Sequence, residues 1–207
     1  FRPNLGDWEN SSPDWDEVIS TFPRGELRDY LGMVSTGEVS IAVKPQYIDK
    51  LPRIFDGEVR ELLARVDDRG EIKNYTELMG ISHILDRKLG DLSGGELQRV
   101  AICATLLKEA DVYFFDEPSS YLDIYERMRM VGVVRGLAEK GKRVLVVEHD
   151  LAILDVLCDS IHVIYGERSA YGIFTPPRST RTAINAYLDG FLPEENVRIR
   201  DKPIQFL

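Results

Sequence analysis

The feature that most constrains the fold is the alternation of short apolar segments with helix-like segments in the second half of the chain. The segments "DVYFF", "RVLVV" and "SIHVIY" read as strands, and helical apolar spacing occurs between them, over residues 123–139 and near 151–157. A short strand, "YGIF", and a helix over 179–189 follow. This alternation is typical of a mostly parallel sheet with helices on its faces. We therefore predict an α/β domain with a ligand site at the carboxyl ends of the strands.

The first half of the chain is predicted to be mainly helical. Two short amphipathic helices between residues 12 and 37 would each carry one apolar stripe, formed by Trp15, Val18, Ile19 and Phe22 and by Leu27, Tyr30, Leu31 and Val34. We expect a buried strand at "VSIAV" (39–43) and helices of a second lobe at 56–66 and 74–81. The sequence leaves open whether the helical hairpin packs on the domain or docks a partner.

Charge and composition argue against several classes of protein. The formal net charge of −9 disfavours binding to nucleic acid or to an anionic membrane through overall charge. No apolar run reaches the roughly 18 residues of a membrane-spanning helix. Cys103 and Cys158 lack a CxxC motif and a histidine at ligand spacing, so we expect two reduced core cysteines. These observations predict a cytoplasmic protein without a membrane partner.

One predicted helix start has the features of an anion site. In "LSGGELQRV", Ser93 is followed three residues later by Glu96, which is a capping box, with Gly94 and Gly95 between them. Two glycines in the first turn leave free backbone N–H groups at the positive end of a helix, and these groups suit a phosphate. Taken alone, a capping box is more often structural than functional.

Two strand ends carry the residues best suited to catalysis. Asp116 and Glu117 follow the apolar strand "VYFF", and His149 follows "RVLVV". Adjacent carboxylates after buried residues crowd negative charge, which a cation would relieve, and a neighbouring carboxylate can orient an attacking water. Because both strands should end at one edge of the sheet, we expect His149 to lie near the two carboxylates.

Taken together, these residues resemble the motifs of the ATP-binding-cassette (ABC) ATPases. LSGGE (92–96) is similar to the signature motif, VYFFDE (112–117) to Walker B and SSYLD (119–123) to the D-loop. His149 resembles the switch histidine, and Gln46 the glutamine of the Q-loop. The segments "VKPQYID", "YFFDEPSSYLDI", "VLVVEHDLAILD" and "IHVIYGERSAYGIF" resemble more narrowly the first nucleotide-binding domain of family E, the RNase L inhibitor family, which acts in ribosome recycling.

The resemblance implies a P-loop NTPase-type fold with a mostly parallel sheet, helices on both faces, a helical signature lobe and a helical-hairpin insertion. Residues 1–195 would form a partial nucleotide-binding domain, with the insertion at 12–37, the signature lobe at 50–110, and a hinge segment at 196–207 similar to the family's hinge. The N-terminal part of the domain is expected to be missing. The family's iron–sulfur clusters are expected only in an N-terminal domain absent from this chain, because two cysteines cannot supply their ligands.

The resemblance also implies roles for individual residues, with ATP and Mg²⁺ as cofactors. Gln46 and Asp116 would hold Mg²⁺ and the attacking water, Glu117 would act as general base or polarise that water, and His149 would contact the γ-phosphate. Ser93, Gly94, Gly95 and Glu96 would complete the ATP site of a facing cassette, and Asp123 would couple the two sites. The implied partners are the second nucleotide-binding domain of the same protein, ribosomal subunits and release or termination factors.

One stretch imitates a phosphate-binding loop. "GLAEKGKR" (136–143) has most of the spacing of G-x-x-x-x-G-K-[ST], but Arg143 occupies the hydroxyl position. A working loop follows a strand and starts a helix, whereas this stretch ends a predicted helix at Gly141 and enters a strand. We interpret it as a helix stop and expect the true loop before Phe1, so these 207 residues alone should be inactive.

Two alternatives to an ATP-hydrolysing ribosome-recycling factor remain open. A membrane-transporter cassette would share the chemistry but would have no helical hairpin at 12–37. A non-hydrolysing interaction module would use the hairpin and the signature region only for docking. Such a module would have no need of Glu117 beside Asp116.

Overall fold

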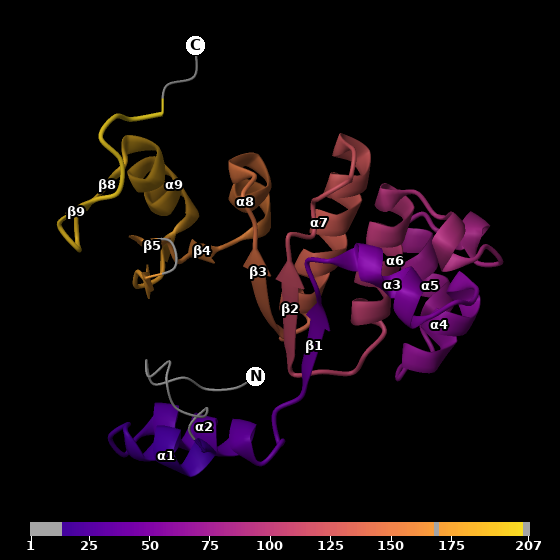
Figure 1. The fold of residues 1–207 in the computed structure, drawn as a ribbon, viewed down its shortest axis with the longest axis horizontal. Coiled ribbons are helices and arrows are strands. Elements are labelled where there is room, and N and C mark those ends of the chain that lie inside the picture. Colours follow the sequence, from indigo (N-terminus) through magenta and orange to yellow (C-terminus); the bar gives the residue numbers. More distant parts are fainter. Residues whose placement is uncertain (1–13, 168–169, 205–207) are drawn as a thin grey trace.

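The computed structural model describes residues 14–167 and 170–204 (Figure 1). The α-helices are α1 (Trp15–Ser20), α2 (Glu26–Ser35), α3 (Leu51–Ile54), α4 (Val59–Val66), α5 (Ile72–Leu78), α6 (Gly94–Leu106), α7 (Ile124–Glu139), α8 (Leu151–Leu157) and α9 (Thr180–Asp189). Short 3₁₀ turns are η1 (Ile48–Lys50), η2 (Ser82–Ile84) and η3 (Leu89–Asp91). The strands are β1 (Ile41–Lys44), β2 (Val112–Asp116), β3 (Arg143–Val147), β4 (Ser160–Ile161), β5 (Ile164–Glu167), β6 (Tyr171–Phe174), β7 (Arg178–Ser179), β8 (Phe191–Leu192) and β9 (Val197–Arg198).

The centre of the fold is a parallel sheet in the order β1-β2-β3. Lys44 pairs with Phe115 and Asp116 pairs with Val147, so the three strands end at one edge. Figure 1 shows this edge at the top of the sheet, where the chain continues from β1 toward α3. The sequence prediction of parallel strands with a common carboxyl edge is therefore confirmed.

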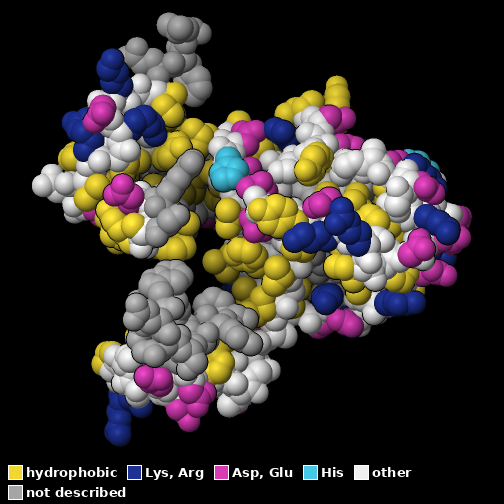
Figure 2. Space-filling model, in the orientation of Figure 1, with side chains coloured by type: hydrophobic (Ala, Val, Ile, Leu, Met, Phe, Trp, Pro, Cys, Tyr) yellow, Lys and Arg dark blue, Asp and Glu magenta, His cyan; other side chains and the backbone are white. Residues whose placement is uncertain are grey.

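The two faces of the sheet differ in burial. Ala42 and Lys44 are buried, since they point toward the side where α6 packs on β1, whereas Ile41 and Val43 stay about half exposed. Leu145 of β3 is exposed to the same extent, and Figure 2 shows hydrophobic side chains gathered at the centre of the molecule. The prediction that residues 39–43 form a wholly buried strand was thus right for one face only.

Helix α6 is the main packing element of the core. Most of its side chains are buried, among them Leu97, Val100, Ile102 and Leu106. They join one hydrophobic cluster with the sheet, α4, α5, α7 and α8. Burial on this scale fixes α6 relative to β1 and β2, because each large apolar side chain removed from water contributes about 1.5–3 kcal/mol.

The strands after residue 158 do not extend the parallel sheet. The segment predicted as one strand, "SIHVIY", splits into β4 and β5, which pair antiparallel with β7 and β6 respectively. The ring Nδ1 of His162 lies 2.8 Å from the Thr175 carbonyl, and Val163 N–H donates to the Thr175 hydroxyl at 2.9 Å. Residues 162 and 163, which lie between β4 and β5 in the chain, thus use side-chain contacts in place of regular ladder bonds, and this explains the break.

Helices α1 and α2 form the predicted hairpin, which lies apart from the helical lobe of α3–α6 (Figure 1). Asp14 caps α1, and Gly37, with φ of +76°, follows the end of α2. None of the ten residues of α2 is buried. Within the described ranges, no helix combines the length and apolarity needed to cross a lipid bilayer.

The predicted boundary at residues 195 and 196 falls within a β-turn. Strands β8 and β9 pair antiparallel around Asn196, and the N–H groups of Ile199 and Arg200 donate to the Gly190 carbonyl. The start of the predicted hinge therefore packs against the end of α9.

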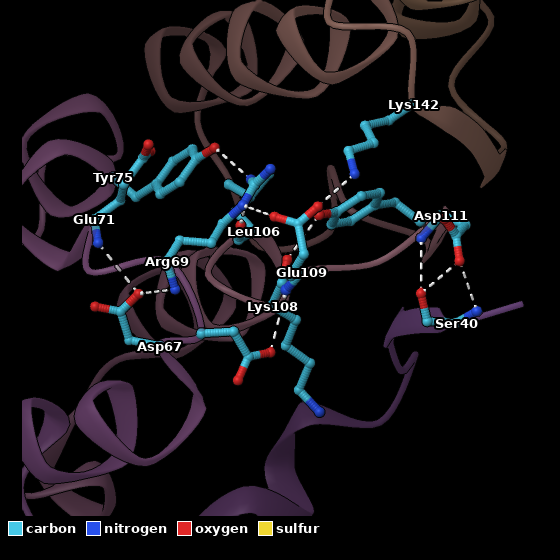
Figure 3. Close-up of polar contacts among 12 residues, drawn as sticks. Ser40, Asp67, Arg69, Glu71, Tyr75, Leu106, Lys108, Glu109, Asp111 and Lys142 are labelled. Atoms are coloured by element: carbon cyan, nitrogen blue, oxygen red, sulfur yellow. Dashed lines mark hydrogen bonds and ion pairs between the residues drawn. The ribbon is translucent and has the colours of Figure 1, made fainter. Parts of the chain in front are cut away.

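A polar network joins the amino ends of the three parallel strands (Figure 3). Ser40 and Asp111 bond to each other just before β1 and β2, and Lys142, just before β3, pairs with Glu109. Arg69 donates to Glu109 at 2.7 Å, and hydrogen bonds from Lys142 and Arg69 hold the pKa of Glu109 below its usual value. Helix α7 stops before Gly141, whose φ is +79°. Lys142 thus has a structural partner at the edge opposite the strand ends, as expected of a helix stop.

We predict that Lys142→Ala leaves ATP binding unchanged, because Lys142 takes part in an ion pair that is partly exposed and far from the carboxyl edge. Unfolding should become easier by about 1 kcal/mol or less. The measurement is the ATP dissociation constant of the full-length protein, with exposed Lys140→Ala as the matched control. A loss of ATP affinity confined to the Lys142 variant would mean that "GLAEKGKR" contacts phosphate.

Candidate functional site

Glu117 is the centre of the site at the carboxyl edge of the sheet. Its carboxylate Oε1 accepts hydrogen bonds from Gln46 Nε2 and His149 Nε2, each at 2.7 Å. Its second oxygen, Oε2, accepts a longer bond of 3.3 Å from the Ser120 hydroxyl. Residues from the ends of three strands therefore meet at one carboxylate. We call Gln46, Asp116, Glu117 and His149 the carboxylate site.

Neighbouring elements fix the two partners of Glu117. Gln46 follows β1 by two residues and precedes η1, which is anchored by buried Ile48. His149 precedes α8, whose N-terminus is capped by Asp150, and Arg127 of α7 pairs with Asp150 at 2.7 Å. The folding of α7 and α8 therefore places the imidazole at the end of β3.

The electrostatics favour an ionised Glu117. The hydrogen bond from His149 is the largest cause that lowers the pKa of Glu117 below its usual value, and Gln46 and Ser120 act in the same direction. With a carboxylate as its partner, Nε2 of His149 carries the proton. The His149 side chain is 75% exposed and that of Glu117 is 20% exposed, so solvent reaches the histidine while the carboxylate is sheltered.

The backbone of Glu117 is unusual. Its φ is +47°, in the left-handed region that residues other than glycine rarely adopt. Its N–H donates to the Val147 carbonyl at 2.8 Å, which extends the β2–β3 pairing beyond Asp116. Non-glycine residues keep such conformations at a cost of about 1–3 kcal/mol, and they cluster at functional sites.

The oxygen atoms present suit Mg²⁺. Among the described residues, none donates a hydrogen bond to the carboxylate of Asp116, and the amide of Gln46 uses its nitrogen on Glu117. This leaves a carboxylate and an amide oxygen, which are ligand types that Mg²⁺ accepts. No group of three or more His, Cys, Asp or Glu side chains that could hold a metal ion occurs in ranges 14–167 and 170–204.

Lys44 is a member of this region that the sequence analysis missed. It is fully buried, and its Nζ donates to the main-chain carbonyls of Asp116 at 2.7 Å and Glu117 at 3.3 Å. Burial lowers the pKa of Lys44 to about 8, against the opposing effect of Asp116, Glu117 and Glu148. The period-two alternation of β1 was the available signal, because it puts Lys44 on the same face as Ala42.

The residues resembling the signature motif and the D-loop form a second group, the signature edge (Ser93, Gly94, Gly95, Glu96 and Asp123). The capping box is present, with the Ser93 N–H and hydroxyl both donating to Glu96 at 2.8 Å. These bonds are the largest causes of the lowered pKa of Glu96. Within the described ranges, no hydrogen bond joins residues 93–96 to the side chains of Gln46, Glu117 or His149.

Gly94 and Gly95 are also required for packing, which the sequence did not reveal. A Cβ on Gly95 would lie 2.9 Å from the Tyr121 carbonyl, and one on Gly94 would lie 3.1 Å from the Tyr121 ring. The 119–123 loop therefore packs directly on the first turn of α6. Asp123 caps α7 by accepting from the Glu126 N–H, and Glu126 pairs with Arg99 of α6 at 2.9 Å. The signature edge is thus one packed unit.

Comparison with known proteins agrees with this geometry. A family model described as "ABC transporter" matches residues 20–120. ABC transporter E family member 1 of Arabidopsis thaliana is 42% identical over 206 residues, which is 100% of this chain and 34% of that protein. The chain spans about a third of the length of the curated relatives it matches.

Solved structures give the same result. An archaeal ribosome recycling factor, in a crystal structure with the archaeal ribosomal stalk protein, is 50% identical with a TM-score of 0.90, over 96% of this chain and 38% of that chain. A structure named RNase-L Inhibitor is 50% identical with a TM-score of 0.89, over 95% of this chain and 38% of that chain. With its parallel sheet, helical lobe and ordered motifs, the chain belongs to family E of the ABC ATPases, the RNase L inhibitor family.

Proposed function

We propose that this chain is part of an ATPase that binds and hydrolyses ATP between two cassettes and uses their closure to split ribosomal subunits. The observation that carries the proposal is the convergence of Gln46 and His149 on the carboxylate of Glu117. An ionised carboxylate that is held through one oxygen and lies beside a second carboxylate is suited to activating water next to a phosphate.

The chain's own residues would divide the chemistry as follows. Glu117 would take the proton of the attacking water on Oε2, which has only the long bond from Ser120. Gln46 would orient Glu117 and the water. The exposed His149, whose Nε2 proton bonds to Glu117 in this structure, would transfer that hydrogen bond to the γ-phosphate when ATP is bound. Each role needs an atom at the carboxyl edge, and each side chain lies there.

Asp116, together with the Gln46 amide oxygen, would hold Mg²⁺. When bound, the ion would neutralise charge that develops on the phosphate oxygens. The buried ammonium of Lys44 lies behind Asp116 and bonds to its main chain, so the carboxylate remains available on the other side. The cofactors proposed for the whole protein are therefore ATP and Mg²⁺, with iron–sulfur clusters only in a further N-terminal domain.

A second cassette is part of the proposal because, among the described residues, the signature edge makes no hydrogen bond to the side chains of the carboxylate site that would face a bound nucleotide. Residues 93–96 make no hydrogen bond to the Gln46, Glu117 or His149 side chains within the described part of the chain, yet Ser93 and Gly94 are exposed. An exposed helix N-terminus suits phosphates presented by another domain. Asp123, between Tyr121 and α7, would couple the two sites, since the 119–123 loop begins two residues after Glu117 and packs on α6.

The proposed domain organisation is the one that the resemblance to family E implies. Residues 1–195 would form a partial nucleotide-binding domain, with the insertion at 12–37, the signature lobe at 50–110 and a hinge at 196–207. The hinge would start as strand β9, which already pairs with β8. A cytoplasmic location, where ribosomes work, completes the proposal.

Ribosomal subunits and release or termination factors are the proposed partners. The support comes from the relatives, since one solved structure is an archaeal ribosome recycling factor bound to the ribosomal stalk protein. The hairpin offers the surface, because Leu27, Tyr30 and Met33 of α2 are exposed. The hairpin and the family E relatives disfavour a transporter cassette, and the partnered Glu117 disfavours a non-hydrolysing module.

We predict that Glu117→Gln in the full-length protein preserves ATP binding, slows hydrolysis about 100-fold or more and traps the closed form. The amide keeps the shape, and its oxygen still accepts from Gln46 and His149, but it cannot accept a proton from water. The measurement is single-turnover hydrolysis with the ATP dissociation constant. Glu109→Gln, at the opposite edge of the sheet, is the control. Wild-type turnover by the Glu117 variant would remove this residue from the chemistry.

We predict that Leu27→Ser combined with Tyr30→Ser weakens ribosome association by about tenfold, because two exposed apolar contacts would be lost. ATP hydrolysis without ribosomes should not change. Co-sedimentation with ribosomal subunits measures the effect, and Asp29→Ser, a polar change on the same helix, is the control. Equal binding by the double variant and the control would argue against docking through α2.

A further inference from the structure

We propose that Lys44 and Gln98 are positioning residues. Together they form a clamp: from the buried face of the sheet they hydrogen-bond to the main-chain carbonyls of residues 116–118 and so hold Glu117 in its left-handed conformation. Both are fully buried polar side chains, one from β1 and one from α6. This inference rests on the proposed function, in which the carboxylate of Glu117 activates water. Neither residue reaches that carboxylate, so both would act only through the backbone that carries it.

Lys44 supplies the first half of the clamp. Its side chain runs along the covered face of the sheet, and its Nζ donates to the carbonyls of Asp116 and Glu117. These carbonyls lie where β2 ends, beyond the last β1–β2 pair, Lys44 with Phe115. The ammonium therefore takes the place of the strand partner that β1 no longer provides at residues 116 and 117.

Gln98 supplies the second half from the first turns of α6. Its Nε2 donates to the carbonyls of Glu117 at 2.9 Å and Pro118 at 3.0 Å. Both contacts are carbonyl oxygens, which fixes the orientation of the amide. The buried Oε1 of Gln98 has no hydrogen-bond partner among the described residues. The position therefore does not satisfy the full hydrogen-bonding capacity of this amide. A buried amide left half-satisfied is costly and calls for a compensating role.

The main chain at this point needs such restraint. Glu117 has a φ of +47°, and the following Pro118 further restricts the conformations open to it. Three successive carbonyls, those of residues 116–118, accept hydrogen bonds from Lys44 and Gln98. Without these two side chains the carbonyls of Asp116 and Pro118 would lose their side-chain donors, and that of Glu117 would keep only a long bond of 3.4 Å from the Ser120 N–H. Released from the clamp, Glu117 would relax toward negative φ, and its carboxylate would leave the reach of Gln46 and His149.

The choice of a lysine also fits a positioning role better than a packing role. A buried ammonium is expensive, because burial disfavours the charged form. A neutral donor would satisfy the same carbonyls at lower cost. The cation, however, faces Asp116, Glu117 and Glu148 and offsets the charge of three carboxylates gathered at one edge.

The test compares Lys44→Met and Gln98→Met in the full-length protein with Thr105→Val. Thr105 is a buried polar residue on α6 whose hydroxyl bonds to the Ala101 carbonyl, away from the site. We expect the single-turnover rate of hydrolysis to fall about tenfold or more in each Met variant, while the ATP dissociation constant stays within about twofold. The Thr105 variant should keep the wild-type rate. A wild-type rate in a folded Lys44 or Gln98 variant would overturn the proposal.

Two further measurements separate positioning from general damage. In a Glu117→Gln background, Lys44→Met should cause no further loss of rate, because both changes act through one group. An additional tenfold fall would contradict the proposal. Amide hydrogen exchange at Glu117, whose N–H bonds to Val147, should speed up in both Met variants but not in the Thr105 variant. Equal exchange in all three variants would overturn the clamp.

The failure of the clamp can be told apart from the failure of the proposed function. If Glu117→Gln hydrolyses ATP at the wild-type rate, the catalytic assignment is wrong, and the exchange measurement alone then decides the clamp. If Glu117→Gln is inactive while both Met variants are fully active, the catalytic assignment stands and the clamp is wrong. If Lys44→Met does not fold, the hydrolysis rate and the amide exchange of Gln98→Met decide the proposal, because this change leaves the number of buried charges unchanged.

Discussion

The turn that follows β2 is the constraint on which the rest of the site depends. At Glu117 the chain leaves the sheet in a left-handed conformation, and every polar atom of this residue has a partner: Val147 for the N–H, Lys44 and Gln98 for the carbonyl, and Gln46, His149 and Ser120 for the carboxylate. These partners come from four separate parts of the chain. A single residue thus ties β1, β3, α6 and the start of α8 together, and the fold and the site stabilise each other.

The parallel sheet makes this convergence possible. Strands that run in one direction end at one edge, so the end of β2 and the short loops after β1, β2 and β3 bring an amide, two carboxylates and an imidazole to one place. The opposite edge carries a network of ion pairs and hydrogen bonds around Ser40, Asp111, Glu109 and Lys142, which has no role in the proposed chemistry (Figure 3). Function and structural support therefore occupy opposite ends of the same strands.

Sequence reasoning found those parts of the site that depend on local pattern. The capping box of Ser93 and Glu96 and the meeting of Glu117 with His149 follow from spacing and from strand direction, and both are present. Lys44 and Gln98 do not stand out in the sequence, because their roles arise only when α6 packs against the sheet and buries them. The glycines at 94 and 95 suggest only a phosphate site in the sequence, whereas Tyr121 packs against both of them. The break between β4 and β5 escaped notice because Thr175, which causes it, lies 12 or more residues further along the chain.

The central claim is that the carboxylate of Glu117 activates the attacking water from the position that the turn gives it. A crystal structure of the full-length protein with Mg²⁺ and a non-hydrolysable ATP analogue tests this claim most directly. The account predicts a water about 3 Å from Oε2 of Glu117 and in line with the γ-phosphate, with the φ of Glu117 still positive. A Glu117 carboxylate turned away from the phosphate, with another side chain holding the water, would contradict it.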